Sequence, residues 1–279
     1  MLYAKPKKEA LAIHERAVTK YNAAFQEMEQ IGGRLYNKRC DCVLLIHEIE
    51  LLINSIANRP KEFEKKISEI QVAREKFQET ETYALEAMDA VVKSGVSIIA
   101  SVAGGAAVAS MAPSAAMWIA TTFGTASTGT AISTLHGAVA TKAALAWLGG
   151  GALSAGGAGV AGGQALLALA GPIGWGITGV TTAASAIALG HKNKQIADKA
   201  IEEAKKITIA GAEVNETSTK IQHLVDETVM LMDDLRDMTQ VNRTLKGANY
   251  LELSEDEQYR LGIMVNNTLT LAELLNKTI

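Results

Sequence analysis

The glycine-rich stretch GGGALSAGGAGVAGG, residues 149–163, is the first place in this chain where residue types and spacing could bind a ligand. Glycine-rich loops bind phosphates when a strand precedes them and a GxxxxGK[ST] pattern or a downstream acidic residue completes the site. No such pattern is present, no strand is predicted before the glycines, and the next acidic residue is Asp198. A nucleotide site is therefore not expected here.

Cys40, Cys42 and His47 are the residues nearest to a metal-ligand pattern. Zinc sites use four ligands, and no fourth ligand follows at a usual spacing. On a helix, residues two apart point to different faces, and a disulfide between Cys40 and Cys42 would close a small, strained ring. The sequence thus predicts no metal, no cofactor and no disulfide framework.

His136 and Lys142 flank apolar runs and could respond to pH or to lipid headgroups. The alternative is that they lie at a polar turn or extend their polar ends to water. Since no catalytic pattern occurs elsewhere, the chain is predicted not to be an enzyme and to have no small-molecule substrate. The net charge of −3, without a basic stripe, argues against nucleic acid as a partner.

Charge divides the chain into three parts, residues 1–93, 94–190 and 191–279. The outer parts are rich in charged residues of both signs, whereas the central part contains only Lys142. A segment of that length normally has roughly a quarter of its residues charged. The central part is therefore expected to be a buried core or a membrane-inserting region.

Apolar residues recur at helical spacing in both outer parts, and polar residues lie between them. A turn is predicted at 58–60, a helix end near Gly247 and a capping box at Ser254 to Glu257. These signals predict an all-α fold, an elongated antiparallel bundle with a long hairpin over 1–93 and further helices over 191–279. The stripes are Val18, Tyr21, Phe25, Met28, Ile31 and Leu35, then Phe63, Ile67, Ile70, Arg74 and Phe77, then Ile221, Leu224, Val225, Thr228, Met232, Leu235 and Met238.

The central part has room for membrane-crossing segments. Residues 94–120 are uncharged and long enough to cross a bilayer, although Pro113 would kink a helix there, and residues 143–189 have room for two crossings. The only tryptophans of the chain, Trp118, Trp147 and Trp175, all lie in this part. Indoles are typical of membrane interfaces, and buried packing is the alternative explanation.

Small residues dominate the central part and give it little insertion free energy per residue. Gly151, Ala155, Gly159 and Gly163 repeat every four positions, a ladder that lets helix backbones approach closely. Alanine, leucine and valine between the glycines argue against a flexible linker. Runs such as ITGVTTAASAIAL also have some strand propensity, so the conformation of this part stays open.

The layout, long helices around one apolar Gly/Ala-rich element, resembles the α-helical pore-forming toxins, the family of cytolysin A and the haemolysin BL and non-haemolytic enterotoxin components. The resemblance implies that the apolar element is held against the bundle until membrane contact releases it to oligomerise. It predicts a lipid membrane and either further copies or companion helical subunits as partners. The alternatives are a non-lytic subunit of a multi-component toxin and a permanently anchored coiled-coil scaffold.

The N-terminal residues MLYAKPKKEALAIHERAV contain no apolar segment of the kind that a secretory signal needs. The chain is thus expected to be made without a classical signal peptide. It would stay in the cytoplasm or leave by a non-classical route, and then associate with a membrane.

Overall fold

The computed structural model describes residues 4–93, 118–122, 124, 126, 130–148 and 186–279. Within these ranges the chain is mostly helical and has no strand, which confirms the all-α prediction. The long helices are α1 (Ala4–Ser55), α2 (Lys61–Lys93), α6 (Ala186–Asn242) and α7 (Glu255–Leu275). Shorter elements are α4 (Gly137–Leu148) and the 3₁₀ turns η2 (Ile132–Thr134), η3 (Arg243–Leu245) and η4 (Tyr250–Glu252).

The first hairpin reverses at the predicted turn. Asn58 has a φ of 53°, a left-handed conformation that asparagine tolerates better than most residues. The Arg59 guanidinium donates to the carbonyl of Asn54 at 3.1 Å and so satisfies a backbone acceptor at the end of α1. Pro60 then precedes the first residue of α2 and cannot continue the helix of α1.

The second hairpin also follows the sequence signals. After α6 and η3, Gly247 has a φ of +76°, which only glycine adopts without strain. The capping box at the start of α7 is complete, because the Ser254 hydroxyl accepts from the Glu257 amide while the Glu257 carboxylate accepts from the Ser254 amide at 2.8 Å. Both helix boundaries therefore arise from local chemistry.

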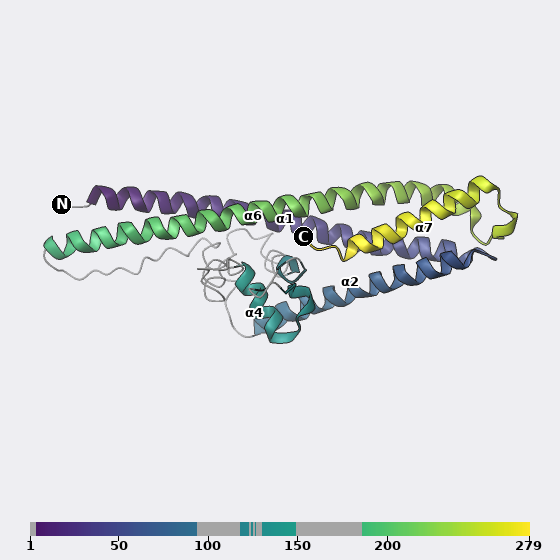
Figure 1. Cartoon of the computed structure of the whole chain (residues 1–279), viewed down its shortest axis with the longest axis horizontal. Helices are drawn as coiled ribbons and strands as arrows, with labels where there is room; N and C mark the ends of the chain where they lie inside the picture. The colour runs from purple at the N-terminus through teal and green to yellow at the C-terminus, as the bar shows by residue number, and fades with distance from the viewer. Residues whose placement is uncertain (1–3, 94–117, 123, 125, 127–129, 149–185) are drawn as a thin grey trace.

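The two hairpins lie side by side in the same direction, so that α1 is parallel to α6 (Figure 1). Residue numbers rise together along the pair. His14 lies 3.3 Å from Glu203, the Arg34 side chain donates to Gln222 at 2.9 Å, and Arg243 pairs with Glu48 at 2.6 Å. The prediction of an antiparallel partner from the third part is wrong for this pair. Short connections force neighbouring helices to be antiparallel, whereas the long central part removes that constraint.

The second helix of each hairpin packs on its counterpart. Contacts of α2 are mainly with α7, and few are with α1. The Lys66 ammonium donates to the Asn266 side chain at 2.7 Å, and the Asn276 amide donates to the Ala73 carbonyl at the same distance. Near the two hairpin turns, α1, α2, α6 and α7 thus pack together, and each hairpin helps to cover the other.

Backbone hydrogen bonds join the two hairpin turns. The Ala57 amide donates to the Ala248 carbonyl, the Tyr250 amide donates to the Ala57 carbonyl, and both distances are 2.9 Å. The rings of Phe63 and Tyr250 meet edge to face with centroids 5.7 Å apart. These contacts set the relative position of the two hairpins at this end.

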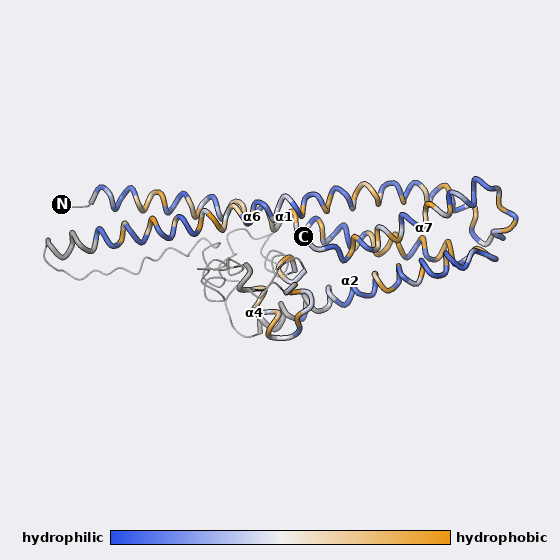
Figure 2. Tube along the Cα trace, viewed as in Figure 1, coloured by the Kyte–Doolittle hydropathy of each residue, from blue (hydrophilic) through white to orange (hydrophobic). Residues whose placement is uncertain are grey.

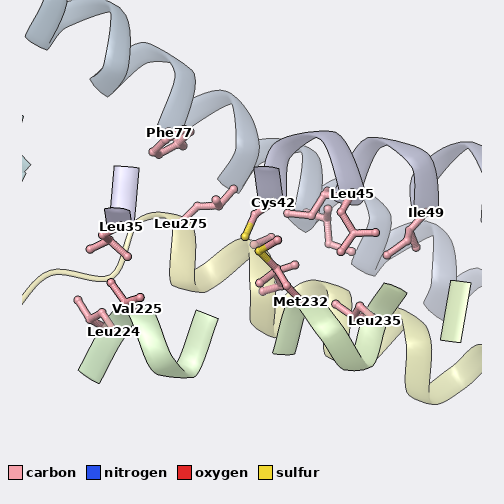
Figure 3. Packing of buried hydrophobic residues seen from close by; sticks show 14 of the residues in the cluster. Leu35, Cys42, Leu45, Ile49, Phe77, Leu224, Val225, Met232, Leu235 and Leu275 are labelled. Carbon is pink, nitrogen blue, oxygen red and sulfur yellow. The ribbon is translucent and has the colours of Figure 1, made fainter. Parts of the chain in front are cut away.

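The core follows the helical stripes, which Figure 2 shows as short apolar bands along otherwise polar helices. In the four-helix half, large side chains fill the interior, and Cys42 of α1 and Met232 of α6 point into the space between the helices (Figure 3). Toward the start of α1, the buried residues of a second, smaller cluster between α1 and α6 are all alanines, Ala10, Ala197 and Ala200. The predicted stripe residues are buried, and these include the polar Thr228. The exceptions are Arg74 and Met238, which are half-buried, and Phe25, whose side chain lies outside the described residues.

Candidate functional site: where the central part packs on α1

The described residues of the central part include one short helical segment, 118–122, that packs on α1 halfway along its length. Ile119 and Ala120 are completely buried there. A Cβ atom added to Gly32 of α1 would lie 2.0 Å from the Ile119 Cδ1 atom, closer than any real contact. Gly32 therefore provides the space that Ile119 fills, and a larger residue would exclude it.

Trp118 covers the next turn of α1. Its ring meets the ring of Tyr36 edge to face at 5.2 Å between centroids, and the Arg39 guanidinium lies 5.8 Å from its centroid. Edge-to-face aromatic pairs and a cation over an indole are both favourable beyond the area they bury. Only 4% of Trp118 is exposed. The indole thus joins the central segment to α1.

Arg39 is a fully buried cation at the level where α7 ends. Its Nη2 group donates to the carbonyl of Lys277 at 2.8 Å. Burial lowers the pKa of Arg39 to about 9, because the charged form loses its hydration. The guanidinium stays mostly protonated at neutral pH and connects α1, the segment after α7 and the central segment.

A hydroxyl, a thiol and a carboxylate meet between α1 and α2 beside Trp118. The Tyr36 hydroxyl donates to the Glu81 carboxylate, and the Cys40 thiol lies 3.9 Å from the same carboxylate. Burial and the nearby carboxylate raise the pKa of both Tyr36 and Cys40. The Tyr36 hydroxyl and the Cys40 thiol are therefore neutral at physiological pH, and as hydrogen-bond donors they connect α1 to α2.

The rest of the described central part continues from this contact. The Gly124 amide donates to the Ala120 carbonyl at 3.0 Å, and the Ile132 amide donates to the Gly124 carbonyl at 2.9 Å. Ile132 is fully buried in the same apolar cluster as α1. Helix α4 follows and contacts α2 and η2. Among the described apolar residues of this part, Ile132, Ala140 and Ala144 are thus buried, whereas Val139 of α4 is exposed.

Of the residues that the sequence analysis singles out, some lie within the described ranges and others lie outside them. Trp118 is buried, as the alternative explanation of buried packing predicts for it. Trp147 lies in α4. The ladder Gly151, Ala155, Gly159 and Gly163, together with Trp175, lies outside the described residues. His136, between η2 and α4, and Lys142, on α4, are exposed.

The cysteines do not form a ligand group. Cys42 is buried in the core, whereas Cys40 is half-buried and His47 is largely exposed beside Glu50. In the part of the chain that the structure describes, no set of three His, Cys, Asp or Glu side chains is arranged to hold a metal ion. As expected for residues two apart on a helix, the thiols point to different faces.

The thiols are expected to be almost unreactive in the folded protein. Burial raises the pKa of Cys42 to about 12, and the pKa of Cys40 is raised as well. Since the thiolate is the nucleophile and a raised pKa lowers its fraction, Ellman's reagent at pH 8 should react slowly with native protein and fast with both thiols in urea. Rapid reaction of one thiol without urea would contradict this environment.

The structure shows two features of the site that the sequence reading missed, the fit of Ile119 on Gly32 and the burial of Arg39. One signal was available. Two consecutive glycines, Gly32 and Gly33, inside a long helix cost about 1 kcal/mol each relative to alanine, so at least one of them is expected to serve a close contact. Only the tertiary structure shows which one.

Across the residues that the structure describes, no helix combines the length and the apolar content that a bilayer crossing needs. Comparison with other proteins adds no relative, since no family model, no curated protein and no solved structure matches this chain.

Proposed function

We propose that this chain is a pore-forming or membrane-permeabilising protein that changes from a bundle with a covered central part to a membrane-inserted oligomer. The observation that carries the proposal is the burial of Trp118, Ile119 and Ala120 against α1, within a central part that has a single charged residue. An uncharged region is expected to need cover in water and none in lipid. For Trp118, Ile119 and Ala120, helix α1 is part of such cover.

The bundle has a core that does not depend on the central segment. Helices α1 and α6 pack along their length, α2 packs on α7, and the hairpin turns are joined by their own hydrogen bonds. Of the described central residues, Trp118 and Ile119 contact α1 at Gly32, Tyr36 and Arg39, near the level where α7 ends. Release of the segment would therefore leave most of the helical core in place.

The residues of the ladder suit packing in lipid. Helix association in membranes relies on close backbone approach, which Gly151, Ala155, Gly159 and Gly163 would permit on one helix face. The resemblance in layout to the cytolysin A family supports the same mechanism, with a membrane and further copies of this chain as partners. In this proposal the long helices remain outside the bilayer and present the central part to it.

Release of a trapped dye from liposomes tests the proposal. We expect leakage with the native chain, and about ten-fold less with Gly159→Leu and Gly163→Leu combined, because leucine prevents close helix contact. The matched control is Gly157→Leu with Ala161→Leu, which on a helix lies on the opposite face and should retain leakage. Helix content by circular dichroism should be unchanged in both variants.

The outcomes separate the candidate functions. Absence of leakage under all lipid and pH conditions would overturn a pore formed by this chain alone. Leakage that requires a companion protein would favour the non-lytic subunit of a multi-component toxin. Recovery of the protein only in detergent would favour a permanently anchored scaffold.

A further inference from the structure

The segment that follows α7 contacts three helices near the place where Arg39 meets Trp118. The side-chain amide of Asn276 donates to the Ala73 carbonyl of α2 at 2.7 Å, and the Lys277 ammonium pairs with Glu227 of α6 at 2.9 Å. The carbonyl of Lys277 accepts from Arg39 of α1 at 2.8 Å. Residues 276–277 thus hold their backbone carbonyl in place against the buried guanidinium.

Arg39 in turn connects this carbonyl to the central segment. Its guanidinium contacts both groups, since it donates to the Lys277 carbonyl and lies 5.8 Å from the centroid of the Trp118 ring. A buried cation depends on its hydrogen-bond acceptors, because its hydration is lost. If the Lys277 carbonyl moves away, the guanidinium loses this acceptor and is drawn toward water, away from the position in which it supports Trp118.

We propose that residues 276–277 are a latch that keeps the central segment on α1 through Arg39. The latch regulates the release step, and it rests on the proposed function only for its consequence at a membrane. Lys277 is exposed and Asn276 is half-buried. Displacement of these two residues would weaken the contact of Trp118 and Ile119 with α1. A partner that binds this end of α7 would then favour release of the central part.

Amide hydrogen exchange in solution reads this contact directly. The Gly124 and Ile132 amides donate within the turn that follows residues 118–122. The residues that follow 118–122 depend on the packing of this segment, so their amides are expected to exchange faster when it leaves α1. The experiment needs no membrane, and it is therefore independent of whether the protein permeabilises one.

The test compares two truncations of the full chain. A chain ending at Leu275 loses the Lys277 carbonyl, one of the groups that Arg39 contacts, and we expect exchange of Gly124 and Ile132 to accelerate about ten-fold or more. In a chain ending at Lys277, a terminal carboxylate replaces the carbonyl and can still accept from Arg39, while only the exposed residues 278–279 are removed. Its exchange should therefore be no faster than the native rate. Equal rates in the two truncations would overturn the latch.

A milder variant protects the test against general unfolding. Asn276→Ala with Lys277→Ala removes the two side-chain anchors and leaves the backbone carbonyl, so Gly124 and Ile132 should exchange faster while amides of α1 and α6 keep their rates. If all these amides accelerate equally, residues 276–277 only stabilise the bundle and the latch is rejected. If release occurs and no variant causes leakage, the latch stands and the proposed function fails.

Discussion

Replacement of Gly32 by leucine is expected to displace residues 118–122 from α1 without unfolding the bundle. Even a Cβ atom at this position would lie 2.0 Å from Ile119 Cδ1 and 2.5 Å from Ile119 Cγ1. Overpacking a filled site costs about 1–3 kcal/mol, and the smallest response here is to move the short segment rather than a 52-residue helix. Trp118 should therefore become accessible.

Acrylamide quenching of Trp118 fluorescence measures this change, in a chain with Trp147→Phe and Trp175→Phe so that one indole remains. Gly33→Leu is the matched control, because the neighbouring glycine has the same helix propensity and nothing within 4 Å of its Cβ position. We expect quenching to increase for Gly32→Leu alone. Shielding of Trp118 in both variants would show that Ile119 can be accommodated elsewhere, and the Gly32 contact would not be what holds the segment.

The second large effect is expected from Arg74→Ala, which should lower the free energy of unfolding by about 3–5 kcal/mol. The Arg74 guanidinium lies 3.2 Å from the Glu50 carboxylate, whose side chain is only 4% exposed. Without the arginine, a buried carboxylate on α1 loses the cation that compensates for its lost hydration. His47, at 3.6 Å, is more than half exposed and is a poor replacement.

Urea denaturation followed by circular dichroism gives the magnitude. Lys65→Ala is the control on the same helix, since Lys65 and Glu69 form an exposed pair at 3.9 Å whose loss should change stability by less than about 0.5 kcal/mol. The double variant Arg74→Met with Glu50→Leu should recover much of the loss, because it leaves no unpaired charge. A similar small effect for Arg74→Ala and Lys65→Ala would mean that water reaches Glu50.

Several parts of the fold could be predicted because local chemistry determines them. The Ser254 to Glu257 capping box, the turn at 58–60 and the helix end near Gly247 depend on a few adjacent residues, and each was found. The helical stripes were also found, since burial follows the 3.6-residue period whatever the partner helix is. Arg74 was visible as an exception in its stripe, but its pairing with Glu50 was not.

The direction and pairing of the helices could not be predicted in this way. A stripe identifies the buried face of α1 but not whether α6 runs parallel to it, and the long central part permits either direction. The fit of Ile119 on Gly32 and the meeting of Arg39, Trp118 and Lys277 involve residues far apart in the sequence. No local signal connects them.

The sequence by itself determined an all-α chain with two charged outer parts and one nearly uncharged central part, because composition and period decide what each segment can bury. The tertiary structure alone decided that two hairpins lie in parallel and that the central segment covers α1 just beyond the end of α7. The physical reason is that such contacts depend on shape and on charge between distant residues. A glycine of α1 provides the space, and a buried arginine of α1 donates to a carbonyl of the segment that follows α7.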